Sequence, residues 1–228
     1  AATVNLTIYG QEYDITTRGL AVMNMILHGR ETSDIRQGDV IAEPQFLAGD
    51  TALQTFDFVV ANPPFSLKAW SSGLTADNAF GRFEDGMPPE KNGDFAFLLH
   101  FLASMKSTGS GAVILPHGVL FRSNKEAVLR ERILRRGYIK GIIGLPANLF
   151  YGTGIPASIL VLDKSEACAE RPIFMIDASG GFIKDGNKNR LRERDIHKII
   201  DAFAGELEMP GYSRRVDWAE IASNDFNL

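Results

Sequence analysis

The sequence predicts an α/β fold with a mostly parallel, twisted sheet. Short apolar runs rich in β-branched residues recur along the chain. Segments with helical spacing of apolar residues alternate with these runs, and Gly, Pro and polar residues separate the two. Such alternation is typical of parallel strands whose sheet is covered by helices on both faces. With 228 residues and 45% hydrophobic content, the chain can bury a sizeable core.

Strands are predicted from the apolar runs at residues 4–9, 56–61, 111–115, 139–145, 157–162 and 173–176. The second run has the composition of a strand buried in a parallel sheet. Pro63 and Pro64 forbid its continuation, so this strand ends at Asn62. Gly109 to Gly111 are predicted to form a turn ahead of the third strand.

The first helix is predicted over residues 16–28. Its apolar residues Leu20, Met23 and Leu27 share one face, and Gly29 is a usual helix stop.

Further helices are predicted from capping residues and spacing. Asp94 can cap a helix, and Ser123 with Glu126 three residues later predicts a capping box for the next. A last helix follows from the apolar residues Ile196, Ile199, Ile200 and Phe203, which precede Gly205. Residues 66–93 and 180–194 are long Gly/Pro/polar stretches, expected to serve function or to be disordered.

Bulk properties limit the function classes. The lone Cys168 cannot form an internal disulfide, and the four histidines do not lie at metal-ligand spacing with cysteine. We expect a reducing, cytoplasmic setting and no metal. No apolar stretch reaches the length of a membrane span, so no membrane role is expected.

The tetrapeptide at residues 62–65, Asn-Pro-Pro-Phe, indicates a pocket for an amino group. Prolines lack an N–H, so the backbone here offers carbonyls and few donors. The Asn62 side-chain oxygen and the Pro63 carbonyl can together accept both hydrogens of a planar –NH₂, and Phe65 offers a face for stacking a heteroaromatic ring. The alternative is an ordinary strand-ending turn. Its place after a strand favours a site, because ligands of open α/β sheets lie beyond the carboxyl ends of strands.

Asn-Pro-Pro-Phe in this position resembles motif IV of amino-group DNA methyltransferases that act on adenine N6. The whole chain is similar to the modification subunit of type I restriction-modification systems. The similarity is carried by these further segments: Tyr9-Gly10-Gln11-Glu12, Met23-Asn24-Met25-Ile26-Leu27-His28-Gly29, Gly38-Asp39, Leu115-Pro116-His117-Gly118-Val119-Leu120-Phe121, Leu145-Pro146 with Asn148-Leu149-Phe150, and Asn224-Asp225-Phe226-Asn227-Leu228.

The resemblance implies a partial Rossmann-like core of an S-adenosylmethionine-dependent methyltransferase. Residues 1–165 are then a partial catalytic domain from its second strand onward, and residues 166–228 a C-terminal extension with a strand, a basic loop and a helix. The family's glycine-rich cofactor loop has no counterpart, since the early glycines are Gly10 and Gly19. We therefore expect a fragment, shortened at both ends, that binds S-adenosylmethionine weakly or not at all and is inactive alone.

The resemblance also assigns site residues. Glu12 is expected to bind the cofactor ribose, although a lone carboxylate here is more often simply solvated. Asp39 is expected to contact the cofactor adenine, with Asp50, also in a Gly-Asp pair, as the alternative. The catalytic residues are Asn62, Pro63, Pro64 and Phe65.

Phe65 and Phe150 are expected to stack on a target base that is flipped out of the duplex. Hydrophobic packing is the alternative role for Phe150. His117 is expected to make a structural hydrogen bond rather than contact phosphate. The basic residues Lys184, Lys188, Arg190, Arg192 and Arg194 can face DNA or simply form a solvated loop.

The resemblance implies methyl transfer to adenine N6 of double-stranded DNA. The implied partners are a specificity subunit and a restriction subunit, with two modification subunits per complex. The net charge of −4 is unhelpful for a DNA-binding protein, so much of the DNA contact is expected elsewhere. Two alternatives remain: a protein glutamine-amide methyltransferase, which usually has Tyr in place of Phe65, and an interaction module without catalysis.

Overall fold

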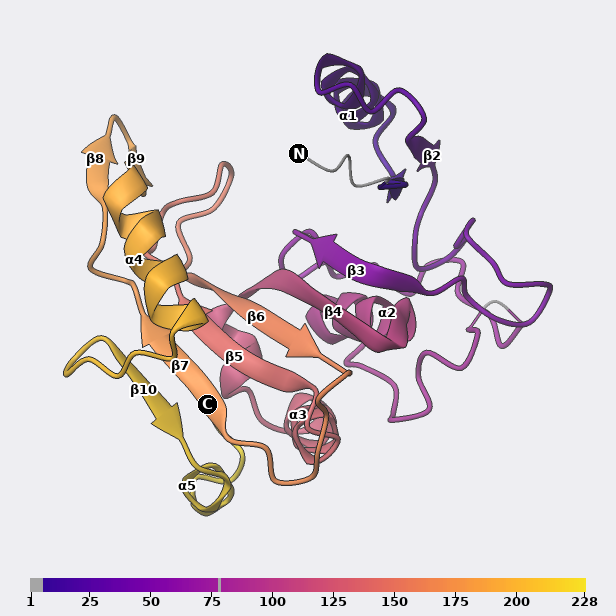
Figure 1. Ribbon diagram of the computed structural model, residues 1–228. Coiled ribbons are helices and arrows are strands. Elements are labelled where there is room, and N and C mark those ends of the chain that lie inside the picture. The colour runs from indigo at the N-terminus through magenta and orange to yellow at the C-terminus, as the bar shows by residue number, and fades with distance from the viewer. Residues whose placement is uncertain (1–5, 78) are drawn as a thin grey trace. The chain divides into compact units, whose positions relative to one another are not determined.

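The computed structural model describes residues 6–77 and 79–228, which divide into two compact units. Of the described residues, 6–54, 71–77 and 79–81 belong to the first unit, and Thr55–Trp70 and Arg82–Leu228 belong to the second. Figure 1 labels the elements of both, and each unit is described by itself.

The first unit contains a two-stranded parallel sheet and one helix. Strands β1 (Tyr9–Glu12) and β2 (Asp34–Gln37) pair with Glu12 opposite Gln37, and α1 (Ile15–Leu27) connects them. Asp14 caps α1 by accepting a hydrogen bond from the Thr17 N–H, and Gly29 follows the helix with φ +66°. The prediction of this helix is confirmed.

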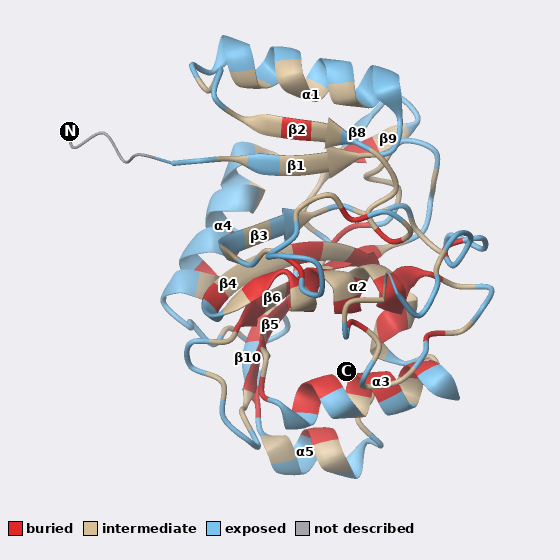
Figure 2. Ribbon diagram, turned by 90° about the vertical axis from the view of Figure 1, so that its right-hand side faces the viewer, coloured by how far each residue is buried: buried red, intermediate tan, exposed pale blue. Residues whose placement is uncertain are grey.

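One expectation for the first unit differs from the structure. Strand β1 spans Tyr9–Glu12, whereas the predicted strand spans residues 4–9; of that run, Val4 and Asn5 lie outside the described residues. Among the described residues, Leu20, Met23 and Leu27 on the apolar face of α1 are 58%, 52% and 77% exposed. Figure 2 shows that helix in the colours of exposed and intermediate residues.

The second unit is built on a six-stranded sheet with the order β10-β7-β5-β6-β4-β3. Its strands are β3 (Phe56–Ala61), β4 (Met105–Pro116), β5 (Ile139–Gly144), β6 (Ala157–Asp163), β7 (Ile173–Asp177) and β10 (Ser213–Val216). The pairings run β3, β4, β5 and β7 in one direction, with β6 and β10 opposed. The sheet is therefore mixed and mainly parallel, and the α/β class is confirmed.

Helices cover both faces of this sheet (Figures 1 and 2). Helices α2 (Asp94–Ala103), α3 (Lys125–Arg135) and α5 (Trp218–Ser223) share one core with the sheet, and α4 (Glu193–Ala204) packs on the other face. Alternation along β5 serves both cores: Ile142 belongs to the first and Ile143 to the second. The short 3₁₀ helix His117–Leu120 follows β4, and β8 (Ile183–Asp185) and β9 (Lys188–Arg190) form a hairpin.

Strand β3 has the predicted bounds but not the predicted burial. It is an edge strand in which Phe58 and Val60 are 74% and 82% exposed, whereas Val59 and Ala61 pack against the core. Composition alone does not distinguish an edge strand from a central one.

The predicted turn at residues 109–111 is wrong, because these residues lie inside β4. A Cβ on Gly111 would come within 2.2 Å of the Val59 carbonyl oxygen. Glycine is thus used here for close approach of two strands rather than for a turn.

The predicted capping box is also wrong. Helix α3 begins at Lys125 after Asn124, and Asn124 makes no capping hydrogen bond. Glu126 is buried and faces Arg122 at 3.2 Å. Glu126 does lie in the first turn of a helix, but it pairs with the Arg122 guanidinium four residues earlier rather than with the backbone N–H of a capping residue.

Strands β7 and β10 follow the predicted domain boundary at residue 165 and lie in the same sheet as β3 to β6. The boundary itself stays a prediction. Within the described ranges, no helix has the length and apolar character needed to cross a membrane.

Candidate functional site

The carboxyl ends of β3, β4, β5 and β7 lie along one edge of the sheet, because these strands run in the same direction. The 62–65 segment follows β3 at this edge, His117 follows β4, and the loop of residues 147–154 follows β5. Ligands of open α/β sheets bind beyond such ends. This edge is therefore the candidate site of the second unit.

The acceptors predicted for an amino group are accessible. Asn62 and Pro64 are exposed, and Pro63 and Phe65 are half-buried. Within the part of the chain that the structure describes, neither the Asn62 amide nor the Pro63 carbonyl has a hydrogen-bond partner. Both oxygens are thus available to a ligand.

Phe65 and Phe150, predicted from separate motifs, are brought together. Their ring centroids lie 5.7 Å apart and their planes meet at 78°, an edge-to-face arrangement. The two rings come from loops that follow different strands, and both are half-buried. Phe65 follows Asn62 and Pro63 closely along the chain, so the aromatic pair adjoins the segment that carries the two predicted acceptors.

The loop carrying Phe150 is held by the β8–β9 hairpin. The Lys188 ammonium donates to Asn148 Oδ1 at 3.1 Å, to the Phe150 carbonyl at 2.7 Å and to the Thr153 carbonyl at 3.0 Å. Asn189 also donates to the Ala147 carbonyl at 2.7 Å. Sequence reasoning missed this role, because only the folded loop gathers the acceptors around Lys188.

Other cations of the same basic run are paired nearby. Arg190 lies 2.9 Å from Asp185, and Arg192 lies 2.7 Å from Asp195. Lys184 lies 5.8 Å from the centroid of the Phe182 ring. These pairings favour the solvated-loop interpretation of the run over a DNA-facing one.

His117 lies half-buried at the candidate edge. Its backbone N–H donates to the Pro156 carbonyl at 3.2 Å, but its Nε2 is buried and has no partner among the described residues. The structural hydrogen bond expected of the His117 side chain is therefore not made by Nε2 within the described chain. Hydrogen bonds from Ser179 hold the pKa of the nearby Asp177 below its ordinary value, and the charge of His117 contributes.

In the first unit, Glu12 and Asp39 lie at the same end of the β1–β2 pair. The Gly38 N–H donates to the Glu12 carbonyl at 3.0 Å, which joins the end of β1 to the Gly38-Asp39 pair. The Glu12 carboxylate accepts from the Asp14 N–H, and Asp39 accepts from the Ile41 and Ala42 N–H groups. Asp50 instead lies exposed between the bridged residues Leu47 and Leu53.

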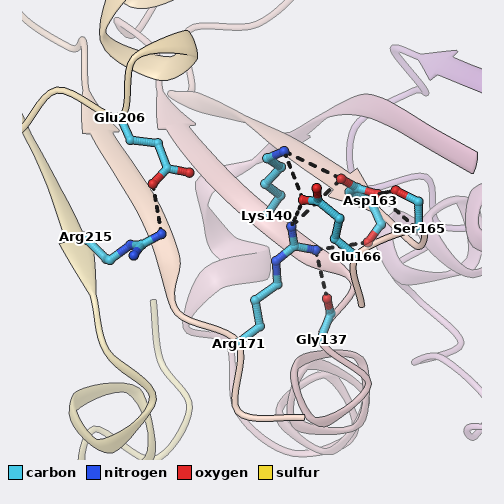
Figure 3. A network of polar contacts seen from close by, with 8 residues as sticks. All are labelled: Gly137, Lys140, Asp163, Ser165, Glu166, Arg171, Glu206 and Arg215. Carbon is cyan, nitrogen blue, oxygen red and sulfur yellow. Dashed lines mark hydrogen bonds and ion pairs between the residues drawn. The ribbon is translucent and has the colours of Figure 1, made fainter. Parts of the chain in front are cut away.

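A second polar cluster occupies the opposite edge of the six-stranded sheet (Figure 3). Lys140 at the start of β5 lies 3.6 Å from Asp163 at the end of β6 and 3.5 Å from Glu166. Arg171 donates to the Asp163 carbonyl at 3.1 Å, and Arg215 lies 2.8 Å from Glu206.

A cavity of about 220 Å³ is lined by Lys140, Glu166, Arg171, Glu206 and Arg215 of this cluster, together with Pro172 and Phe174. Burial raises the pKa of Asp163, but hydrogen bonds from Ser165 outweigh it and hold the pKa below its ordinary value. Every charge drawn in Figure 3 faces an opposite one, so the cluster is accounted for as a structural network. No group of three or more His, Cys, Asp or Glu suited to a metal occurs among the described residues.

Comparison with known families decides between the interpretations of this fold. The family described as N-6 DNA methylase matches residues 1–228. The chain belongs to the N-6 DNA methylase family. The type I restriction enzyme MpnII methylase subunit of Mycoplasma pneumoniae is 33% identical over 234 residues, covering 98% of this chain and 42% of that protein.

Solved structures agree with this family. The type I restriction-modification system methyltransferase subunit from Streptococcus thermophilus has a TM-score of 0.85 and 33% identity, over 99% of this chain and 53% of that one. A Listeria monocytogenes protein assigned to the class I S-adenosylmethionine-dependent methyltransferases has a TM-score of 0.56 at 18% identity, covering 89% of this chain and 56% of that one. The fold is that of these methyltransferases. The chain spans about half the length of the relatives that it matches.

Proposed function

We propose that this chain is the catalytic part of a type I modification subunit that methylates adenine N6 in DNA. The observation that carries the proposal is the pairing of accessible acceptors at Asn62 and Pro63 with the Phe65–Phe150 aromatic contact. In an N-6 DNA methylase fold, these groups match the amino edge and the face of an adenine.

Asn62 and Pro63 act on the nucleophile. Adenine N6 is a poor nucleophile because its lone pair is delocalised into the ring. Two acceptors that bind both N6 hydrogens favour a more pyramidal nitrogen, which stabilises the transition state more than the ground state. A strong base is not required, since the N6 proton becomes acidic once the nitrogen is alkylated.

Phe65 and Phe150 act on the base itself. The N6 group is inaccessible inside a duplex, so the adenine must be flipped out at a cost of a few kcal/mol. Stacking on an aromatic side chain offsets about 1–3 kcal/mol of this cost per base. We assign this contact to Phe65, which is half-buried rather than enclosed in the core.

Glu12 and Asp39 fit part of S-adenosylmethionine. Their carboxylates are acceptors at the carboxyl end of a parallel strand pair, where an acidic residue typically binds a ribose. We assign Glu12 to the ribose hydroxyls and Asp39 to the adenine of the cofactor. When bound, S-adenosylmethionine supplies an electrophilic methyl group.

The proposed partners follow from the relatives. Double-stranded DNA is the substrate, and a specificity subunit and a restriction subunit complete the complex, with two modification subunits. We place the protein in the cytoplasm, where its DNA is.

A product analysis tests the proposal. The full-length protein, assembled with its specificity subunit, is incubated with tritiated S-adenosylmethionine and genomic DNA from a host lacking the system. The proposal predicts label in N6-methyldeoxyadenosine after nuclease digestion. Label in methylated cytosine, or in a protein glutamine amide, would overturn it.

A further inference from the structure

The backbone directly after Phe65 is held in an uncommon conformation. Ser66 has φ +53°, in the left-handed region that residues other than glycine rarely adopt. Such a conformation persists only where the surrounding structure holds it. The Ser66 N–H donates a 2.7 Å hydrogen bond to Asp94 Oδ1.

Asp94 joins this loop to a second segment of the chain. It is the first residue of α2 and is 0% exposed. Its Oδ2 accepts from Arg122 Nη1 at 2.7 Å and from Ser66 Oγ at 3.4 Å. A buried carboxylate is tolerated only when it is paired and hydrogen-bonded. The ion pair with Arg122 therefore stabilises the Asp94 carboxylate to which Ser66 donates.

Arg122 is itself fixed in place. A Cβ on Gly118 would lie 2.3–2.5 Å from atoms of the Arg122 guanidinium, so the absence of a side chain at Gly118 leaves the space that this guanidinium occupies. The same Nη1 lies 3.2 Å from Glu126, and the Arg122 carbonyl accepts from Arg130 Nη1 at 2.9 Å. Arg122 is therefore a rigid partner rather than a mobile surface cation.

The neighbouring residues of the loop rest on the same helix start. The Gly93 N–H donates to the Leu67 carbonyl at 2.9 Å, and a Cβ on Gly93 would lie 2.7 Å from Trp70 Cβ. The start of α2 thus contacts Ser66 and Leu67 through hydrogen bonds and Trp70 through close packing, just after the proposed catalytic residues.

We propose that Asp94 and Arg122 are positioning residues that set the geometry of the 62–65 segment through the Ser66 N–H. This proposal rests on the proposed function, because the segment is taken to bind the adenine amino group. Neither side chain touches the adenine. Displacement of reacting groups by about 1 Å can cost 10²-fold in rate, so a rigid hold on this loop is a catalytic requirement.

The experiment uses the full-length protein assembled with its specificity subunit. The variants are Asp94→Asn, Arg122→Lys and the double variant Asp94→Asn with Ser66→Gly. Asp57→Asn is the matched control, because its carboxylate is also paired, with Lys106 at 2.8 Å, but at the other end of β3. Each variant is measured for the single-turnover methylation rate, cofactor affinity, thermal midpoint and hydrogen exchange at the Ser66 amide.

We expect Asp94→Asn and Arg122→Lys to speed exchange at Ser66 and to lower the methylation rate about 10- to 100-fold, with cofactor affinity unchanged. Ser66→Gly should recover part of the rate lost in Asp94→Asn, because glycine adopts positive φ without the Asp94 contact. Asp57→Asn should change neither quantity.

Unaltered Ser66 exchange in Asp94→Asn would overturn the proposal. Faster exchange at Ser66 together with a wild-type methylation rate would also overturn it. So would a methylation rate that falls only in proportion to the thermal midpoint and is not recovered by Ser66→Gly. The wild-type product analysis is done first, since a failure of the proposed function shows in the wild type alone.

Discussion

Phe65 is neither a core residue nor a free surface ring. It is half-buried, and its contact with Phe150 is edge to face at 5.7 Å. Such a pair contributes about 0.5–1.5 kcal/mol beyond area burial, whereas removing a core phenylalanine costs about 3–5 kcal/mol. Stability and catalysis can therefore be separated at this position.

We predict that Phe65→Ala lowers the free energy of unfolding of this chain by about 1 kcal/mol. In the assembled enzyme it should reduce methylation and the fluorescence rise of 2-aminopurine at the target base. Phe65→Tyr should keep part of both signals, because it retains a flat face. Phe95→Ala is the control, since Phe95 is 1% exposed and its loss should cost about 3–5 kcal/mol. Equal costs at both positions, with unaltered 2-aminopurine fluorescence, would make Phe65 a core residue.

His100 on α2 is held neutral by its surroundings. Burial, together with the charge of Arg82, lowers its pKa to about 3. Arg82 lies 3.2 Å from Nδ1 and the Ser104 hydroxyl lies 3.4 Å from Nε2. A proton added at Nδ1 would face a guanidinium.

This depressed pKa predicts a pH dependence of stability. The His100 side chain takes up a proton near pH 6.5 in the unfolded chain and only near pH 3 in the folded chain. The contribution of neutral His100 to the free energy of unfolding is therefore fully present above pH 6.5 and is lost as the pH falls from 6.5 toward 3. Between pH 7 and pH 5 the expected loss is about 2 kcal/mol. Urea unfolding of wild type and His100→Gln measures it. Between pH 7 and pH 5 the free energy of unfolding of His100→Gln should fall by about 2 kcal/mol less than that of the wild type. Parallel pH dependences of the two proteins would contradict the assignment to His100.

At the scale of elements, the hairpin β8–β9 serves the loop of residues 147–154. Lys188 satisfies three acceptors there, including the Phe150 carbonyl. Asn148 in this loop has φ +59° and donates from its backbone N–H to the Gly154 carbonyl at 3.2 Å. The loop is thus ordered by contacts rather than by its own conformational preference.

We predict that Lys188→Met loosens this loop. The three acceptors are partly buried, and losing the partner of even one costs about 1 kcal/mol or more, so the Asn148 backbone N–H should exchange about tenfold faster. Lys184→Met is the matched control, because Lys184 lies on the same hairpin, where its ammonium is near the Phe182 ring rather than the loop carbonyls. Equal protection of the Asn148 N–H from exchange in wild type and Lys188→Met would show that the loop of residues 147–154 is ordered without Lys188.

Some elements could be predicted from local sequence and others could not. Strand β3 and helix α1 have clear local limits, set by Pro63 and by Asp14 and Gly29, and their bounds were predicted well. Strands β2 and β10 were missed, because Asp34-Ile35-Arg36-Gln37 and Ser213-Arg214-Arg215-Val216 are short and largely polar. They are strands because of their partners β1 and β7.

The candidate site divides in the same way. The 62–65 segment and Phe150 were located by motif, since each is a contiguous signal. The contacts of Asp94, Arg122 and Lys188 join residues 28 to 40 positions apart. No local pattern in the sequence encodes such contacts.

At the scale of the molecule, charge limits what this chain does alone. The net charge is −4, and Lys188, Arg190 and Arg192 of the basic run have partners within the fold. Phosphate contacts require available cations.

We predict weak DNA binding by the 228-residue chain, with a dissociation constant above about 10⁻⁵ M at 0.15 M salt. Its salt dependence should be shallow, because few counterions are released. Fluorescence anisotropy with a labelled duplex, repeated from 0.05 to about 0.2 M salt, measures both quantities. Submicromolar affinity with a steep salt slope would place the main DNA contact in this chain.

In the proposed function, Asn62 accepts a hydrogen bond from the adenine amino group in the transition state. Asn62 is exposed, so Asn62→Ala should change stability by no more than about 0.5 kcal/mol.

The decisive measurement is the methylation turnover of Asn62→Ala in the full-length assembled enzyme. We predict a fall of about 10²–10³ with cofactor affinity unchanged, as for loss of one preorganised transition-state hydrogen bond. Asn62→Asp should retain more activity than Asn62→Ala, because a carboxylate is also an acceptor. A folded Asn62→Ala enzyme with near-normal turnover would contradict the claim.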